Sequence, residues 1–228
     1  MPFPDWTTAV VADACVRLSI ALRIAPPGLR SVVAGARVSG PVRPVQHYGS
    51  VDIFLEAFNS AAKGDVLVID NGGILHEGCI GDLTVIEAAN AGVVGLLVWG
   101  AHRDSSELTA LAIPVFSYGA YPAGPAELRP RCNDALNTAR FGHDRVTSDD
   151  FVFADADGAI FVQTASVDPV LEQAARIWET ERSQVRAVVE GRTLRQQFEF
   201  DRYLLSRAND PSYTFRQHLR EKGSAIEE

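Results

Sequence analysis

Two short apolar runs, separated by one helical pattern, constrain the fold of this chain more than any other feature. Residues 66–70 (VLVID) and 93–99 (VVGLLVW) carry almost no polar side chains. Continuous apolar strands of this length are typical of a sheet that is covered on both faces. Between the runs, residues 82–91 predict a helix, and Gly92 follows as a helix stop. This alternation of strands and helices predicts an α/β domain.

A hairpin and an arm extend this pattern. Asp155-Ala156-Asp157-Gly158 is a hairpin turn signal between two apolar runs, which predicts antiparallel strands and therefore a mixed sheet. Residues 168–190 predict a long amphipathic helix, and the polar residues after it have too few apolar side chains for a core of their own. We therefore divide the chain into an α/β domain (1–191) and a C-terminal helical arm (192–228), which packs on its own body or on a neighbouring subunit. The other expected elements are helices at 5–23, 50–62 and 106–111, strands at 32–42 and 113–116, and a loop at 118–137.

Charge, hydropathy and cysteine content exclude several classes of protein. The net charge of −8 disfavours binding to nucleic acid. No apolar run reaches the roughly 18–20 residues that span a bilayer, so we expect no membrane partner. The first residues, MPFPDW, lack the basic region of a secretory signal, which predicts a cytoplasmic protein. Three widely spaced cysteines predict neither a disulfide framework nor a zinc site.

Lysine is almost absent from the chain, with only Lys63 and Lys222 against nineteen arginines. Neither lysine lies in an apolar stretch that would lower the pKa of its amine, so a Schiff-base mechanism is disfavoured. Cys79 lies in a glycine-containing turn, but no Cys–His motif supports it as a nucleophile.

The turn at residues 78–82 and the pair Arg103-Asp104 frame one helix and one strand. A glycine-containing turn that opens a helix exposes backbone N–H groups to an anion, although a simple helix cap explains the same residues. Arg103-Asp104 follows the second apolar strand, where ligands bind in α/β sheets. Arginine can hold a carboxylate and aspartate can bind a hard cation, but a surface ion pair would look the same in sequence.

Asp82 and Arg103-Asp104, separated by twenty residues and preceded by Gly78 and Gly81, resemble the motif of the RraA-like family. That family includes class II pyruvate aldolases typified by 4-hydroxy-4-methyl-2-oxoglutarate aldolase. The likeness extends over most of the chain and includes residues 64–70, 113–116 and 155–158. It implies a layered β/β/α swivelling-domain fold and a homotrimer or homohexamer with sites between subunits.

The resemblance also implies a role for each residue of the motif. Asp104 would anchor a divalent cation, Mg²⁺ or Mn²⁺, and Arg103 would contact the pyruvyl group of a small 2-oxo acid substrate. Asp82 would hydrogen-bond a water on the metal. A glutamate from the long helix of a neighbouring subunit would complete the site; Glu181 matches it best, and Glu179 is the alternative. The substrate carboxylate would meet the backbone amides of Gly78, Cys79, Ile80, Gly81 and Asp82.

The implied reaction is cleavage of a 4-hydroxy-2-oxo acid, of the 4-carboxy-4-hydroxy-2-oxoadipate or 4-hydroxy-4-methyl-2-oxoglutarate type. The reaction releases pyruvate through an enolate, and oxaloacetate decarboxylation would use the same enolate. Two alternatives stay open: a regulator of ribonuclease E, and a metal-dependent lyase acting on a sugar acid. Asp104 favours catalysis, because the regulatory branch lacks an aspartate after the arginine.

Overall fold

An eight-stranded mixed sheet organises the body of the protein, in a computed structural model that describes residues 6–222. Its centre is parallel and contains β3 (Val38–Gln46), β4 (Val66–Asp70), β6 (Gly95–Trp99) and β8 (Val115–Ser117). Every residue of β4 is buried, and so are the first four residues of β6. The prediction of strands covered on both faces is therefore confirmed. The full order is β1-β12-β11-β3-β4-β6-β8-β2.

The predicted hairpin forms the antiparallel half of the sheet. The strands β11 (Asp150–Asp155) and β12 (Gly158–Gln163) pair with each other, and β11 also pairs with β3. Gly158 has φ +136°, which suits the glycine at this turn. The short strands β1 (Arg23–Ile24) and β2 (Arg30–Ser31) close the two edges of the sheet.

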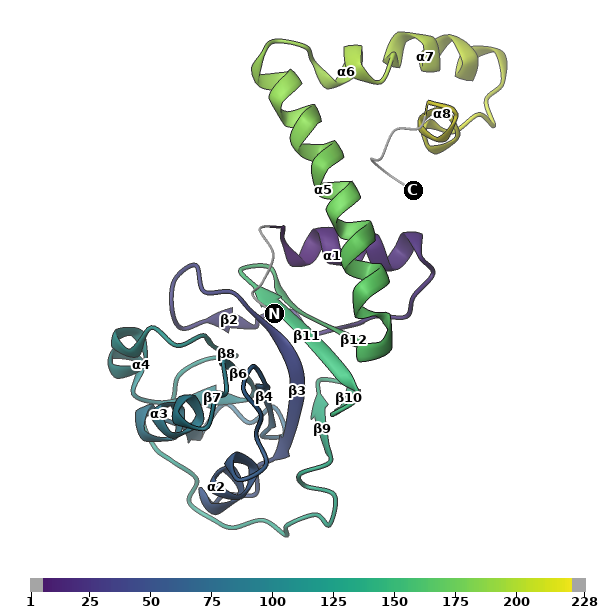
Figure 1. Ribbon diagram of the computed structural model, residues 1–228. Coiled ribbons are helices and arrows are strands. Elements are labelled where there is room, and N and C mark those ends of the chain that lie inside the picture. The colour runs from purple at the N-terminus through teal and green to yellow at the C-terminus, as the bar shows by residue number, and fades with distance from the viewer. Residues whose placement is uncertain (1–5, 223–228) are drawn as a thin grey trace.

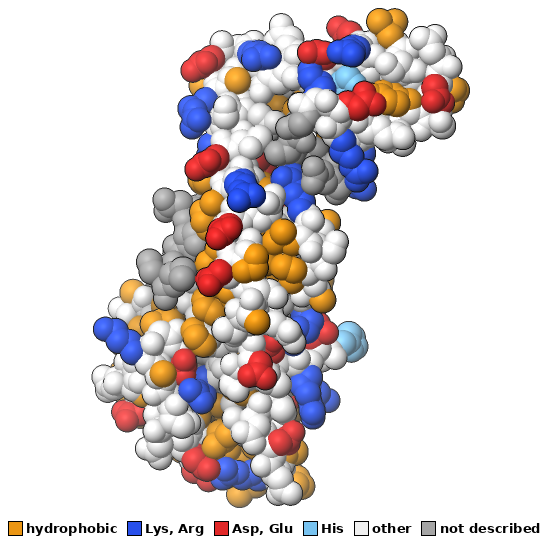
Figure 2. Space-filling model, turned by 45° about the vertical axis from the view of Figure 1, so that its right-hand side comes forward, with side chains coloured by type: hydrophobic (Ala, Val, Ile, Leu, Met, Phe, Trp, Pro, Cys, Tyr) orange, Lys and Arg blue, Asp and Glu red, His pale blue; other side chains and the backbone are white. Residues whose placement is uncertain are grey.

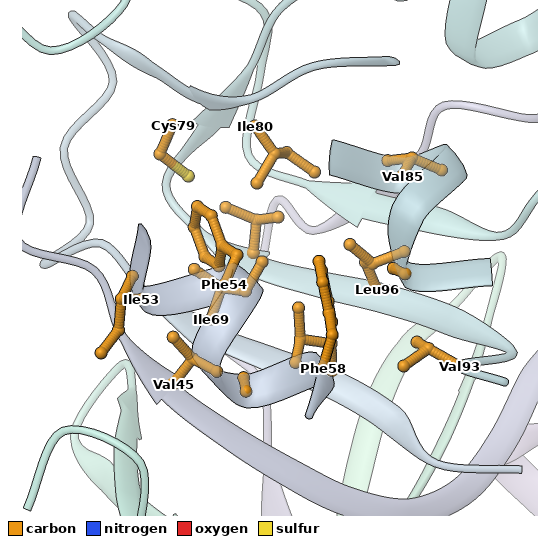
Figure 3. Packing of buried hydrophobic residues seen from close by; sticks show 14 of the residues in the cluster. Val45, Ile53, Phe54, Phe58, Ile69, Cys79, Ile80, Val85, Val93 and Leu96 are labelled. Atoms are coloured by element: carbon orange, nitrogen blue, oxygen red, sulfur yellow. The ribbon is translucent and has the colours of Figure 1, made fainter. Parts of the chain in front are cut away.

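Three short helices cover one face of the parallel strands. Figure 1 shows α2 (Asp52–Phe58), α3 (Asp82–Asn90) and α4 (Ser105–Leu111) on the same side of the body. Side chains from these helices and from one face of β3, β4 and β6 form a buried cluster, shown in Figure 3 with Phe54, Phe58 and Leu96 among its labelled members. The helices expected at 82–91 and 106–111 are confirmed within one residue of their ends, whereas the helix expected at 50–62 is shorter and ends at Phe58.

The other face of the sheet is covered by the chain's own β-structure. Val66, Val68 and Leu97 pack there against Phe141 and Phe161, because the sheet curls and a second hairpin lies across it. This hairpin, β9 (Thr138–Phe141) with β10 (Asp144–Thr147), was not predicted from the sequence. Beyond the hairpin strands, α1 (Thr8–Arg17) packs against α5 (Val167–Val189), as Figure 1 shows.

The long helix α5 joins the body to the C-terminal arm, which stands clear of the body in Figures 1 and 2. The arm contains α6 (Leu194–Gln197), α7 (Phe200–Asn209) and α8 (Phe215–Glu221). Contrary to expectation, it has a small core: Phe198, Tyr203 and Leu219 are buried, and the rings of Tyr203 and Phe215 lie 5.0 Å apart. No helix in residues 6–222 is long and apolar enough to cross a membrane.

Two predicted elements near the N-terminus were wrong in extent. The helix expected at 5–23 ends at Arg17, because Ser19 has φ +54° and the chain then enters β1; its expected start lies outside the described residues. Of the strand expected at 32–42, only residues 38–42 are strand, as the first part of β3; the residues before them form a turn at Gly35 (φ +70°) that connects β2 to β3. Both errors have the same cause. Hydrophobic spacing does not show where a glycine or another residue with a positive φ angle ends a helix or a strand.

Candidate active site

A two-stranded parallel ribbon joins the two ends of the motif. The strands β5 (Gly78–Ile80) and β7 (Ala101–His102) pair side by side, and the Arg103 amide donates to the Ile80 carbonyl at 2.9 Å. The sequence suggested a loose turn at residues 78–82, whereas residues 78–80 are a buried strand. This ribbon brings Gly81 and Asp82 next to Arg103 and Asp104.

Gly81 and Gly78 allow this close approach. A Cβ atom at Gly81 would lie 2.1 Å from Asp104 Oδ2 and 3.2 Å from Arg103 Nε. A Cβ atom at Gly78 would lie 2.9 Å from Arg103 Cβ and 2.7 Å from the Tyr121 carbonyl oxygen. Any larger side chain at Gly81 would occupy the space that the Asp104 carboxylate now fills.

Asp104 has a left-handed backbone (φ 59°, ψ 44°) and occupies the N-cap position of α4, where its side chain makes no capping hydrogen bond. Only a few per cent of non-glycine residues have such a conformation, and aspartate and asparagine are enriched among them. The turn aims the carboxylate back towards Gly81, where Oδ2 lies 3.5 Å from Arg103 Nε. The side chains of Arg103 and Asp104 are 47% and 35% exposed, so both are accessible to a ligand.

Asp82 is the first residue of α3, after an extended Gly81. Its Oδ1 accepts a hydrogen bond from the Leu83 amide at 2.7 Å, which leaves Oδ2 for a ligand or a proton. A carboxylate in the first turn of a helix is stabilised by the helix dipole.

His102, directly before Arg103, is buried between two serines. Its Nδ1 lies 2.7 Å from Ser117 Oγ and its Nε2 lies 2.9 Å from Ser105 Oγ. Burial lowers the pKa of His102, so the ring is neutral at pH 7. The bond to Ser105 spans Arg103 and Asp104 and holds both ends of that two-residue segment.

One amide of the predicted anion site is already engaged, and two of its side chains are buried. The Cys79 thiol is buried, and burial raises its pKa far above the ordinary range, which argues against a nucleophilic thiolate. The Ile80 side chain belongs to the core. The Gly78 amide already donates to the Ala123 carbonyl at 2.8 Å, so it is not free for a substrate. At the start of α3 the Leu83 amide is engaged by Asp82 Oδ1, and the Asp82 and Thr84 amides are better placed for a substrate carboxylate.

A partly buried polar network beside the motif was not identified in the sequence as a unit. Arg129 Nη2 lies 2.9 Å from Asn71 Oδ1 and 2.8 Å from Glu77 Oε1. The same Asn71 oxygen lies 2.7 Å from His47 Nδ1, and burial lowers the pKa of His47. His47 directly follows β3, Asn71 directly follows β4, and Glu77 directly precedes β5. Polar residues that follow parallel strands meet at one edge of the sheet, and this position is the signal in the sequence that could have identified the network.

Glu181 lies on the outer half of α5, which packs against α1 and leads towards the arm (Figure 1). The chain does not bring Glu181 to Arg103 and Asp104. Its role as a residue supplied by a neighbouring subunit stays a prediction.

The residues of the motif fit a cation that keeps most of its water. Within residues 6–222, no three His, Cys, Asp or Glu side chains gather as a metal-binding group. The Asp104 carboxylate, held in the space that Gly81 leaves open, is a single hard oxygen ligand. Magnesium characteristically binds through one or two carboxylates and several waters, and this donor set suits such a cation.

Comparison with solved structures finds the same fold. An uncharacterized protein from Pseudomonas syringae is 25% identical with a TM-score of 0.73, covering 84% of this chain and 92% of that chain. Streptomyces coelicolor RraAS2, described as an unusual member of the RNase ES inhibitor RraA protein family, is 26% identical with a TM-score of 0.67. That match covers 79% of this chain and 93% of RraAS2.

Sequence relatives agree with this result. A Laribacter hongkongensis protein named "Putative 4-hydroxy-4-methyl-2-oxoglutarate aldolase" is 30% identical over 169 residues, 71% of this chain and 98% of the relative. A protein of the same name from Alkalilimnicola ehrlichii is 26% identical over 155 residues, 68% of this chain and 95% of the relative. The RraA-like family model, described as Aldolase/RraA, matches residues 8–161. The ribbon that sets Gly81 against Asp104 lies inside the matched region, and the chain belongs to the RraA-like family.

Proposed function

We propose that this protein is a divalent-metal-dependent lyase that cleaves a 4-hydroxy-2-oxo acid and releases pyruvate. The observation that carries the proposal is the contact between Gly81 and Asp104, which places a carboxylate and the Arg103 guanidinium beside the start of α3. The names of the aldolase relatives support the reaction class.

Arg103 is the group that contacts the pyruvyl half of the substrate. Cleavage of the bond between C3 and C4 leaves its electron pair on the pyruvyl half as an enolate. The guanidinium donates hydrogen bonds to the oxygen on which this charge develops, and one preorganised donor of this kind lowers a barrier by about 3–4 kcal/mol. The amides at the start of α3 hold the substrate carboxylate.

Asp82 is the proton carrier in this proposal. Its Oδ1 is held by the Leu83 amide, so Oδ2 takes up the proton that leaves the 4-hydroxyl group as C4 becomes a carbonyl. The same proton returns to C3 of the enolate and gives pyruvate. Oxaloacetate would form the same enolate on losing carbon dioxide, so decarboxylase activity belongs to the proposal.

Asp104 is the residue that would hold Mg²⁺ or Mn²⁺. When bound, the cation would supply Lewis-acid stabilisation of the developing negative charge, which a single arginine supplies only in part.

The test is a coupled assay of pyruvate release from 4-hydroxy-2-oxo acids and oxaloacetate. We expect Arg103→Ala and Asp104→Asn each to lower kcat/KM at least about 100-fold, and excess chelator to abolish activity. Asparagine keeps the left-handed backbone that Asp104 adopts, so Asp104→Asn removes the charge with little backbone strain. Glu87→Gln, an exposed acid-to-amide change on α3, is the matched control.

Unchanged activity in either site variant, or full activity in chelator, would contradict the proposal. The oligomeric state of each variant, measured by light scattering, separates a lost reaction from a lost assembly.

Regulation of a ribonuclease is a second candidate, favoured by the likeness to RraAS2. Inhibition of a purified ribonuclease E by the wild type, retained in Arg103→Ala and Asp104→Asn, would support it over catalysis.

A further inference from the structure

A pocket of about 430 Å³ lies next to Arg103, and its lining includes Glu77, Tyr121, Gly124, Glu127 and Arg129. Two contacts place it beside the candidate site. A Cβ atom at Gly124 would lie 3.2 Å from Arg103 Nη1, and the Tyr121 carbonyl lies against Gly78. The same segment therefore forms a wall of the pocket and a contact of the arginine that receives the pyruvyl half.

The position of this pocket suits the other half of the substrate. This inference rests on the proposed function, which assigns the pyruvyl half of the substrate to Arg103. The part of the substrate beyond C4 must then lie within a few ångströms of that guanidinium. The pocket has the size of small-molecule sites, which are about 300–1,000 Å³.

The charges of the lining decide what kind of group it accepts. Arg129 is bound by the buried Glu77, which neutralises its charge, and by Asn71. Glu127 is exposed and forms no ion pair within residues 6–222. Among these lining side chains, two carboxylates and one guanidinium leave one net negative charge, while the Arg103 guanidinium beside the pocket is taken by the pyruvyl half. A second carboxylate on the substrate would meet repulsion here.

The hydrogen-bonding groups favour hydroxyl groups instead. The contacts of Arg129 within residues 6–222 use Nη2 and leave the Nε and Nη1 donors for a ligand. Glu127 offers acceptors only. A hydroxyl group can accept a hydrogen bond from Arg129 and donate one to Glu127, whereas a carboxylate can only accept.

We propose that this pocket binds an uncharged, hydroxylated distal half, so that the substrate is a 4-hydroxy-2-oxo acid of the deoxy sugar-acid class and Glu127 is a specificity-determining residue.

The test compares two substrates that differ only at the distal end. 4,5-Dihydroxy-2-oxopentanoate ends in CH₂OH, and 4-hydroxy-2-oxoglutarate has a carboxylate at the same position. We expect kcat/KM for the uncharged compound to be about tenfold higher, because the second carboxylate is repelled by the negative lining; this ratio corresponds to about 1.4 kcal/mol. Glu127→Gln should reduce this preference to less than about threefold, while Glu87→Gln, with the same change in charge, retains it.

Calorimetric titration of both compounds, with Mg²⁺ present, separates this inference from the proposed function. Tighter binding of the uncharged compound without pyruvate release would overturn the proposed reaction and support the pocket. Three outcomes with pyruvate release would overturn the assignment of the pocket and support the reaction. They are equal preference for the two compounds, preference for the carboxylate compound, and a preference that Glu127→Gln leaves intact. Absence of both binding and turnover would overturn both.

Discussion

Asp104 and Gly81 illustrate how much of the candidate site depends on single residues. Asp104 adopts the left-handed backbone, and Gly81 leaves the space into which its carboxylate turns. Neither property is useful without the other. The carboxylate would point elsewhere from a right-handed backbone, and a side chain at residue 81 would displace it.

We expect Gly81→Ala to reduce pyruvate release at least about tenfold while the protein stays folded. The new methyl group would lie 2.1 Å from Asp104 Oδ2, so the carboxylate must move, but Gly81 has an ordinary extended backbone and alanine adds no strain there. Steady-state kinetics at several Mg²⁺ concentrations measure the effect. Wild-type activity at limiting Mg²⁺ would show that the contact has no role.

His47 predicts a pH dependence of stability. Burial lowers its pKa in the folded protein, opposed in part by the hydrogen bond to Asn71. A histidine whose pKa is lowered on folding contributes its full stability above the unfolded pKa of about 6.5, and the contribution is lost as the pH falls below it.

Urea unfolding of the wild type and of His47→Gln between pH 7.5 and 5.0 tests this dependence. The wild type should lose more stability than the variant as the pH falls, by at most about 1.4 kcal/mol per pH unit. Parallel curves for the two proteins would mean that His47 does not become protonated on unfolding in this range.

At the scale of elements, the buried strands β4 and β6 were predictable because each side of them is covered. A strand that is covered on both faces does not alternate between apolar and polar residues, so a continuous apolar run is enough to predict it. The ribbon β5–β7 was not predictable, since GCI and AH are too short to show any period. The hairpin β9–β10 was hidden for a similar reason: only Ala139, Phe141 and Val146 of its eight residues are buried.

No hydrophobic core was expected from the sequence of the arm, but the arm has a small one. Its aromatic side chains are spaced too irregularly to predict a core, yet Phe198, Tyr203 and Phe215 gather in space because three short helices fold back on one another. Capping boxes at Thr193 and Thr214 begin two of these helices.

At the scale of the whole molecule, the body and the arm are joined by α5 and by few contacts beyond it. The Gln197 side chain donates to the Gln184 carbonyl at 3.2 Å, across the junction of α5 and α6. The family match ends at residue 161, inside the body.

A chain that ends at Gly191 should therefore fold. We expect the midpoint of its thermal unfolding to lie within about 4 °C of the full-length value, because the three buried clusters of the body contain no residue beyond Ile177. Calorimetry and near-ultraviolet circular dichroism of both chains provide the comparison. A loss of tertiary signal in the shorter chain would mean that the arm belongs to the same cooperative unit as the body.

The linear order of residues was enough to predict the α/β class, the buried strands and the identity of Arg103 and Asp104 as a notable pair, because hydrophobic period and motif spacing are local properties. It was not enough to show that the Gly78 amide is engaged, that Asp104 turns towards Gly81, or that Glu77, Arg129 and Asn71 form one network. Those facts depend on which segments meet across the edge of the sheet. Asn71 and Arg129, for example, meet there although they are separated by 58 residues, and no local pattern records such a contact.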